Sequence, residues 1–134
     1  RNLTKAIIHA DLFKDNIFFI KDKFSGFIDF YFSCDDFIAY ELALAINAWC
    51  FDFEDGFKEQ NYISLMEGFN EYSSLDESEK KSLNVLLRGA AVRILVTRLH
   101  DMMYHPKDAL VIPKNPKEYL QILEWHQENP EINL

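Results

Sequence analysis

The residues best suited to chemistry lie close together near the start of the chain. His9, Asp11 and Asn16 form the pattern H-x-D-x-x-x-x-N, and Asp29 follows a short way along. Phosphoryl transfer needs a carboxylate beside the attacking hydroxyl, and oxygen ligands that hold Mg²⁺ against the nucleotide phosphates. Asp11 suits the first role, and Asn16 with Asp29 suits the second. The pattern therefore favours phosphoryl transfer from a nucleotide with Mg²⁺.

Two apolar runs are expected to position these side chains. Residues 17–20 and 27–30 are apolar apart from Asp29, and we expect a turn over residues 21–26 between them. Antiparallel strands return the chain to its start, so a hairpin would bring Asp29 beside Asn16. Chance remains an alternative, because His, Asp and Asn are also common turn and cap formers. The hairpin that ends in an acid favours the catalytic interpretation.

Several segments resemble known kinase families. Protein kinases carry a Lys two residues after the catalytic Asp, and a Gly that completes D-F-G. This chain has Phe13 and Tyr31 at those places, as in the branch of aminoglycoside phosphotransferases and choline kinases. Further segments resemble type II homoserine kinases within that superfamily: residues 36–43, 47–51, 88–99 and 113–120. The resemblance covers nearly the whole chain.

This resemblance implies both a fold and a reaction. The fold would be mainly α with a small β-hairpin, as in the C-terminal lobe of a protein-kinase-like fold. Residues 1–30 would hold the catalytic loop and metal-binding hairpin, and residues 36–134 a helical subdomain. The reaction would be ATP-dependent phosphorylation of L-homoserine to O-phosphohomoserine, a step of threonine biosynthesis. The alternatives are another small-molecule kinase, acting on an aminoglycoside or a choline-like alcohol, and a truncated, non-catalytic kinase-like lobe.

The same template assigns roles to the motif. Asp11 would accept the proton of the substrate hydroxyl, and Asn16 and Asp29 would hold Mg²⁺. His9 is expected to donate to backbone carbonyls and fix the loop rather than act as the base.

Three further residues are candidates for substrate binding. A long apolar helix carries Arg93 and Arg98. Buried guanidinium groups must be paired, so internal salt bridges are the simpler explanation. The alternative is that one of them holds a substrate carboxylate bidentately. Asp36 would either cap the helix that follows it or contact the substrate's ammonium group.

The composition excludes some partners. The net charge is −8 and there is no basic run, which argues against nucleic acid and anionic membranes. No apolar stretch is long enough to span a membrane, and no signal segment opens the sequence. Cys34 and Cys50 lack metal-ligand spacing and are expected to be reduced thiols, which suits the cytoplasm.

A kinase of this type needs an N-terminal nucleotide lobe, which is expected to be absent here. The four glycines lie far apart and form no loop that could cover phosphates. Residues 1–134 alone are therefore expected to be inactive. They are also expected to self-associate through apolar hairpin residues that the lobe would cover, such as Phe18, Phe19 and Phe27.

Hydrophobic periodicity predicts a mostly helical chain beyond the hairpin. Residues 31–35 are expected to form a loop, and residues 52–56 a turn. The first two helices are expected over about 36–51 and 58–72. A short charged helix around 77–81 is expected to lead into a separate long helix over 83–104. A last helix is expected over 116–129.

Overall fold

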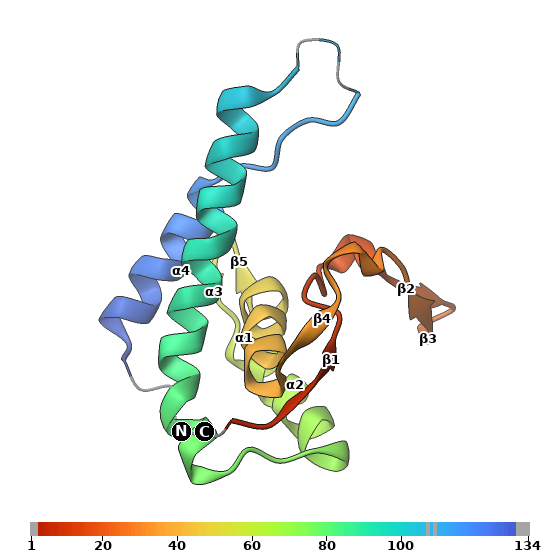
Figure 1. The fold of residues 1–134 in the computed structure, drawn as a ribbon, viewed down its shortest axis with the longest axis vertical. Coiled ribbons are helices and arrows are strands. Elements are labelled where there is room, and N and C mark those ends of the chain that lie inside the picture. The colour runs from red at the N-terminus through yellow and green to blue at the C-terminus, as the bar shows by residue number, and fades with distance from the viewer. Residues whose placement is uncertain (1–2, 107, 109, 131–134) are drawn as a thin grey trace.

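The structure is a computed structural model and describes residues 3–106, 108 and 110–130. Within that part of the chain, long helices pack together and short strands form pairs (Figure 1). The helices are α1 (Ile38–Trp49), α2 (Glu59–Tyr72), α3 (Glu77–Tyr104) and α4 (Lys117–Glu128), with 3₁₀ turns η1 (Lys14–Asn16) and η2 (Phe30–Phe32). The antiparallel pairs are β1 (Lys5–Ile8) with β4 (Cys34–Phe37), β2 (Ile17–Ile20) with β3 (Lys23–Phe27), and β5 (Phe51–Asp52) with β6 (Gly56–Phe57). The expected mainly α fold with a small hairpin is confirmed.

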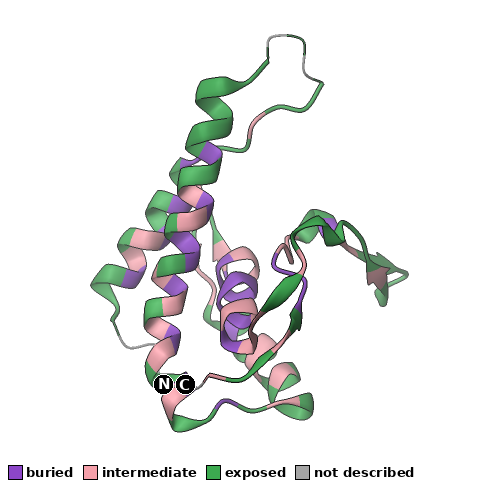
Figure 2. Ribbon diagram, in the orientation of Figure 1, coloured by how far each residue is buried: buried purple, intermediate pink, exposed green. Residues whose placement is uncertain are grey.

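The core lies where α1 packs against α3, and α3 against α4. Nearly every residue of α1 between Ala39 and Asn47 is buried, so this helix forms the centre of the fold (Figure 2). Ala90 and Ala91 of α3 are fully buried, and their small side chains let the helix axes approach closely. The β2–β3 hairpin stands apart from the helices, and its residues Phe18, Phe19 and Phe27 are exposed, as expected. None of the described helices is long and apolar enough to cross a membrane.

The expectation of a short helix around 77–81 followed by a separate long one over 83–104 is wrong. Helix α3 is continuous from Glu77 to Tyr104. A capping box starts it: the Glu79 N–H donates to the Asp76 carboxylate at 2.8 Å, and the Asp76 N–H donates to the Glu79 carboxylate at 2.9 Å. Glu79 also accepts the Thr4 N–H at 2.9 Å, and these backbone donors lower its pKa. Of the charged residues near the start of α3, Glu77, Lys80 and Lys81 are exposed, whereas Glu79 is buried and holds the helix end.

The predicted bounds around β4 and in the hairpin turn are also wrong. Residues 31–35 are not a plain loop, since η2 leads directly into β4. Asp36 lies in that strand opposite Ala6, and so it does not cap α1, which begins at Ile38. The hairpin turn needs only Lys21 and Asp22, both with positive φ as in a type I′ turn. Residues 23–27, expected mainly as turn, form β3.

A buried polar chain links three helices. The Asn47 amide nitrogen donates to the Leu87 carbonyl at 2.9 Å, and the ring of His126 contacts the Asn47 amide oxygen at 2.8 Å. Because that oxygen can only accept, His126 Nε2 carries the proton. His126 is fully buried, and burial, with a further contribution from the charge of Arg88, lowers its pKa from 6.5 to about 4.

Acidification should therefore destabilise the fold through His126. The unfolded chain binds a proton near pH 6.5, whereas the folded chain does so only near pH 4. The contribution is fully present above pH 6.5 and is lost as the pH falls through 4. At 1.36 kcal/mol per pKa unit, the loss is about 3 kcal/mol.

Chemical denaturation of the wild type and of His126→Gln, at several pH values between about 7 and 4, measures this effect. The variant should lose less stability on acidification than the wild type, while His100→Gln, at an exposed site, should behave like the wild type. Equal losses in the wild type and His126→Gln would contradict the assignment.

Candidate active site

The loop between β1 and η1 holds Asp11 in contact with Asn16. The Asn16 amide nitrogen donates to the Asp11 carboxylate at 2.9 Å and to the Asp11 carbonyl at 2.8 Å. These two bonds turn the nitrogen of the amide toward Asp11. The amide oxygen of Asn16 accepts no hydrogen bond from the residues that the structure describes, so it is available to a ligand.

His9 ties this loop to the segment that precedes Asp29. Its Nε2 lies 2.9 Å from the Ile28 carbonyl, which can only accept, so His9 is the donor. The imidazole is buried and its ring centroid lies 4.8 Å from that of Phe30. The sequence indicated this contact with a backbone carbonyl.

The hairpin brings Asp29 back beside the loop, as expected. The Ile28 N–H donates to the Asn16 carbonyl at 3.0 Å, so the residues flanking Asp29 are fixed to the metal-ligand candidate Asn16. Asp29 is exposed and adopts the left-handed conformation, with φ 62° and ψ 65°. Asp residues tolerate this conformation better than most.

The environment raises the pKa of Asp11 above its usual 3.8. Partial burial is the main cause and the negative charge of Asp29 adds to it, while the hydrogen bond from Asn16 and the charge of Arg93 oppose it. A raised pKa makes a carboxylate a better proton acceptor, since base strength follows pKa.

Glu41, in the first turn of α1, was not predicted as a site residue. Its two carboxylate oxygens accept the N–H groups of His9 at 2.8 Å and of Ala10 at 2.9 Å. Ala10 has a φ of 62°, a conformation that costs a non-glycine residue about 1–2 kcal/mol. The one sequence signal for this role is an acid inside an otherwise apolar helix.

Two more side chains fix the loop's carbonyl groups. Trp49 Nε1 donates to the Leu12 carbonyl at 2.7 Å, and Arg93 donates to the Ala10 carbonyl at 3.2 Å. The Arg93 guanidinium also lies over the ring of Phe32, 5.5 Å from its centroid. Arg93 therefore contacts the loop backbone, and within the described residues it has no carboxylate partner.

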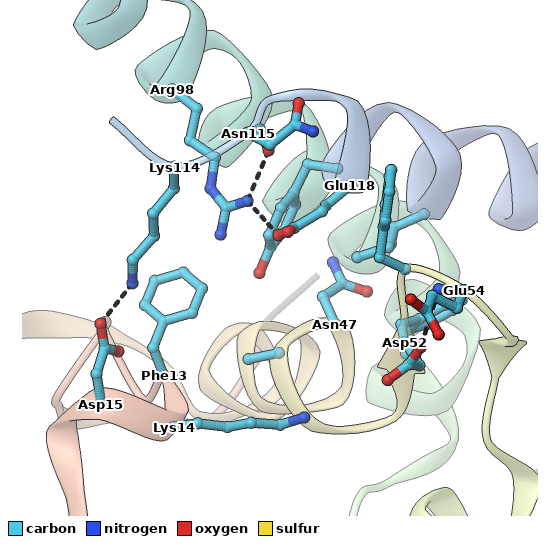
Figure 3. Close-up of a pocket in the computed structure, with 15 residues that line it drawn as sticks. Phe13, Lys14, Asp15, Asn47, Asp52, Glu54, Arg98, Lys114, Asn115 and Glu118 are labelled. Atoms are coloured by element: carbon cyan, nitrogen blue, oxygen red, sulfur yellow. Dashed lines mark hydrogen bonds and ion pairs between the residues drawn. The ribbon is translucent and has the colours of Figure 1, made fainter. Parts of the chain in front are cut away.

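A cavity of about 670 Å³ lies between the loop that carries Asp11 and α4 (Figure 3). Phe13, two residues beyond Asp11, forms part of its wall, and Arg98 enters it from α3. The Arg98 Nη1 group donates to the Glu118 carboxylate at 2.6 Å and to the Asn115 carbonyl at 2.9 Å. The expected salt bridge of Arg98 is thus present. Asp36 does not line this cavity; its carboxylate accepts the N–H of Phe37.

Replacing Glu41 should loosen the loop that carries Asp11. Glu41→Gln keeps one acceptor but turns an amide NH₂ toward the second backbone N–H, so Ala10 loses part of its support. We expect hydrogen exchange at the His9 and Ala10 amides to accelerate by about tenfold or more, since each bond to a charged group is worth about 1.5–3 kcal/mol.

Amide exchange measured by mass spectrometry or NMR tests this, with Glu67→Gln on the exposed side of α2 as the matched control. Unchanged protection of the loop amides in Glu41→Gln would show that the Glu41 contacts do not hold the loop.

Comparisons with known proteins agree with this geometry. The model of the phosphotransferase enzyme family matches residues 1–74, more than half of the chain. The chain is 47% identical over 127 residues to a homoserine kinase of Parvibaculum lavamentivorans, covering 95% of this chain and 40% of the relative. Homoserine kinases of Sinorhizobium fredii and Nitrobacter hamburgensis are 44% and 46% identical, over 95% of this chain and 39% of each relative. The chain thus spans about two fifths of these relatives' length, and it belongs to the phosphotransferase enzyme family.

Proposed function

We propose that the full-length protein is a homoserine kinase, which transfers the γ-phosphoryl group of ATP to the hydroxyl of L-homoserine and forms O-phosphohomoserine. The observation that carries the proposal is the grouping of Asp11, Asn16 and Asp29 on one short loop and hairpin. The similarity to homoserine kinases, which runs along 95% of the chain, supports this choice of substrate. In a cell, the product would enter threonine biosynthesis.

Asp11 is the base in this proposal. Its carboxylate receives the proton of the homoserine hydroxyl as the oxygen attacks the γ-phosphorus, while the bond from that phosphorus to the β-phosphate oxygen breaks and ADP leaves. The hydrogen bond from Asn16 orients the carboxylate, and the raised pKa of Asp11 suits proton acceptance. His9 acts through the backbone that it holds, rather than by contacting the substrate.

Asn16 and Asp29 suit Mg²⁺. Both offer oxygen atoms that lack protein partners within the described residues, and hard oxygen ligands are what Mg²⁺ prefers. No three His, Cys, Asp or Glu side chains gather into a metal site in that part of the chain. That agrees with Mg²⁺ sites that use one or two protein groups together with nucleotide phosphates. Asn16 and Asp29 would hold the ion, which would supply positive charge to offset the negative charge of the phosphates.

The cavity beside the loop favours an amino-acid substrate over the alternatives. Cationic and acidic side chains line it together, including Arg98, Lys114, Asp15 and Glu118. A choline site would need an aromatic cage free of competing cations, and an aminoglycoside site would need mainly acids. A lining of mixed charge suits a zwitterion.

Two further parts of the proposal concern the whole protein. The chain spans about two fifths of its relatives' length, and the aromatic side chains of the β2–β3 hairpin are exposed. We propose that a nucleotide-binding lobe of the full-length protein covers them. We also place the reaction in the cytoplasm, which agrees with the free thiols of Cys34 and Cys50.

The substitution Asp11→Asn in the full-length protein should lower kcat with homoserine about 100-fold or more, because the amide cannot accept a proton. The KM for ATP should change little, since Asp11 does not hold the nucleotide. A coupled ADP assay measures both, with Asp101→Asn, at an exposed site on α3, as the control. A variant that kept half of the wild-type kcat would exclude Asp11 as the base.

Asp29→Ala and Asn16→Ala should each raise the Mg²⁺ concentration needed for half-maximal activity by about tenfold or more. Asn16→Ala should also lower kcat at saturating Mg²⁺, because it frees the Asp11 carboxylate. Asp22→Asn, in the turn of the same hairpin, should leave the Mg²⁺ titration unchanged. If both alanine variants titrated like the wild type, the metal assignment would be wrong.

A further inference from the structure

Arg98 holds hydrogen-bond donors that the fold does not use. The residue is only 8% exposed, and Figure 3 shows its guanidinium reaching into the cavity from α3. Of its five N–H groups, only those on Nη1 bond to protein among the described residues. Arg98 lines the cavity, so Nε and Nη2 are available to an anionic ligand that enters it.

An acid lies directly beside these donors. One oxygen of Glu118 accepts from Arg98, whereas the other has no partner among the described residues. The Glu118 side chain is partly exposed, at 42%, so a ligand in the cavity can reach it. The cavity wall thus presents a cationic and an anionic group side by side, the pattern that complements the head group of an α-amino acid.

This pair lies close to the catalytic loop. The Arg98 guanidinium stacks on Tyr119, 4.6 Å from the ring centroid, and the Tyr119 ring meets that of Phe13 at 6.3 Å. Burial raises the pKa of the Tyr119 phenol, the charge of Arg98 opposes this, and the charges of Glu118 and Asp11 add to it. The phenol thus lies within the electrostatic field of both Asp11 and the ion pair.

The other candidates are already engaged. Arg93 donates to the Ala10 carbonyl and stacks on Phe32, so its role is to fix the loop. Lys114 pairs with Asp15 at 2.5 Å. Asp36 lies in β4 and contacts its own strand. Among the predicted substrate-binding residues, Arg98 is the one that the cavity contains.

We propose that Arg98 and Glu118 form the subsite for the head group of the amino-acid substrate, with Arg98 binding the α-carboxylate and Glu118 the α-ammonium group. The inference rests on the proposed function and names the residues that select the substrate. Homoserine spans roughly 6 Å from its hydroxyl to its carboxylate, given bond lengths near 1.5 Å. Phe13, two residues beyond Asp11, lines the same cavity as this pair.

The test pairs each side chain with the substrate group that it binds. Full-length wild type, Arg98→Lys and Arg98→Met are assayed with L-homoserine and with 3-amino-1-propanol, which is homoserine without the carboxylate. In the wild type, loss of the carboxylate should lower kcat/KM by about 10- to 100-fold, the range for a hydrogen bond to a charged group. In the Arg98 variants, kcat/KM for homoserine should fall most of the way to kcat/KM for 3-amino-1-propanol. Arg88→Met, on the same helix but outside the cavity, is the control.

A second variant and substrate pair keeps the test valid if removing Arg98 unfolds the protein. Glu118→Gln keeps an acceptor for Arg98 at a partly exposed site, and it is assayed with homoserine and with 4-hydroxybutanoate, which lacks the ammonium group. The wild type should prefer homoserine, and the variant should lose most of that preference.

The outcomes separate the two proposals. In one outcome, the wild type phosphorylates homoserine while each variant lowers kcat/KM by the same factor for both substrates of its pair. In that case the subsite is wrong and the proposed function stands. If the wild type does not phosphorylate homoserine, both are wrong.

Discussion

Two backbone N–H groups in the loop that carries Asp11, those of His9 and Ala10, donate to the two oxygens of Glu41. Hydrogen bonds to a charged acceptor contribute about 1.5–3 kcal/mol each, whereas the left-handed conformation of Ala10 costs about 1–2 kcal/mol. The carboxylate therefore more than offsets the strain in the residue immediately before Asp11. Because Glu41 belongs to α1, the most buried helix, the position of Asp11 depends on the core.

The remaining contacts of the loop divide into two sets. Its carbonyl groups at Ala10 and Leu12 are held from the helical side by Arg93 and Trp49. Its reactive side chain is held from the hairpin side, through the Asn16 amide. The backbone is thus held by long-range contacts, while one oxygen of the Asp11 carboxylate and the Asn16 amide oxygen have no protein partner among the described residues. A main chain held in this way suits the proposed phosphoryl transfer, because catalysis of that reaction is mainly positioning and charge stabilisation.

Local patterns in the sequence predicted part of this structure. The spacing of Asp11 and Asn16 and the hairpin that returns Asp29 were predicted, because a loop and two adjacent strands are set by neighbouring residues. Helix α3 was predicted as two pieces because its first turns are charged, although the capping pair of Asp76 and Glu79 marks a single start. Asp36 was expected as a cap because Asp favours that position, yet pairing of β4 with β1 takes precedence. The role of Glu41 depends on a contact across 32 positions, which no local pattern encodes.

In the proposed reaction, the full-length protein uses this loop to transfer a phosphoryl group from ATP to the hydroxyl of an amino acid. The most direct measurement is ³¹P NMR of the full-length protein with ATP, Mg²⁺ and one acceptor at a time: L-homoserine, choline or an aminoglycoside. A phosphomonoester signal that appears with homoserine, and not with the other two, is the predicted result. A phosphorylated choline or aminoglycoside, or ATP that remains intact with homoserine, would contradict it.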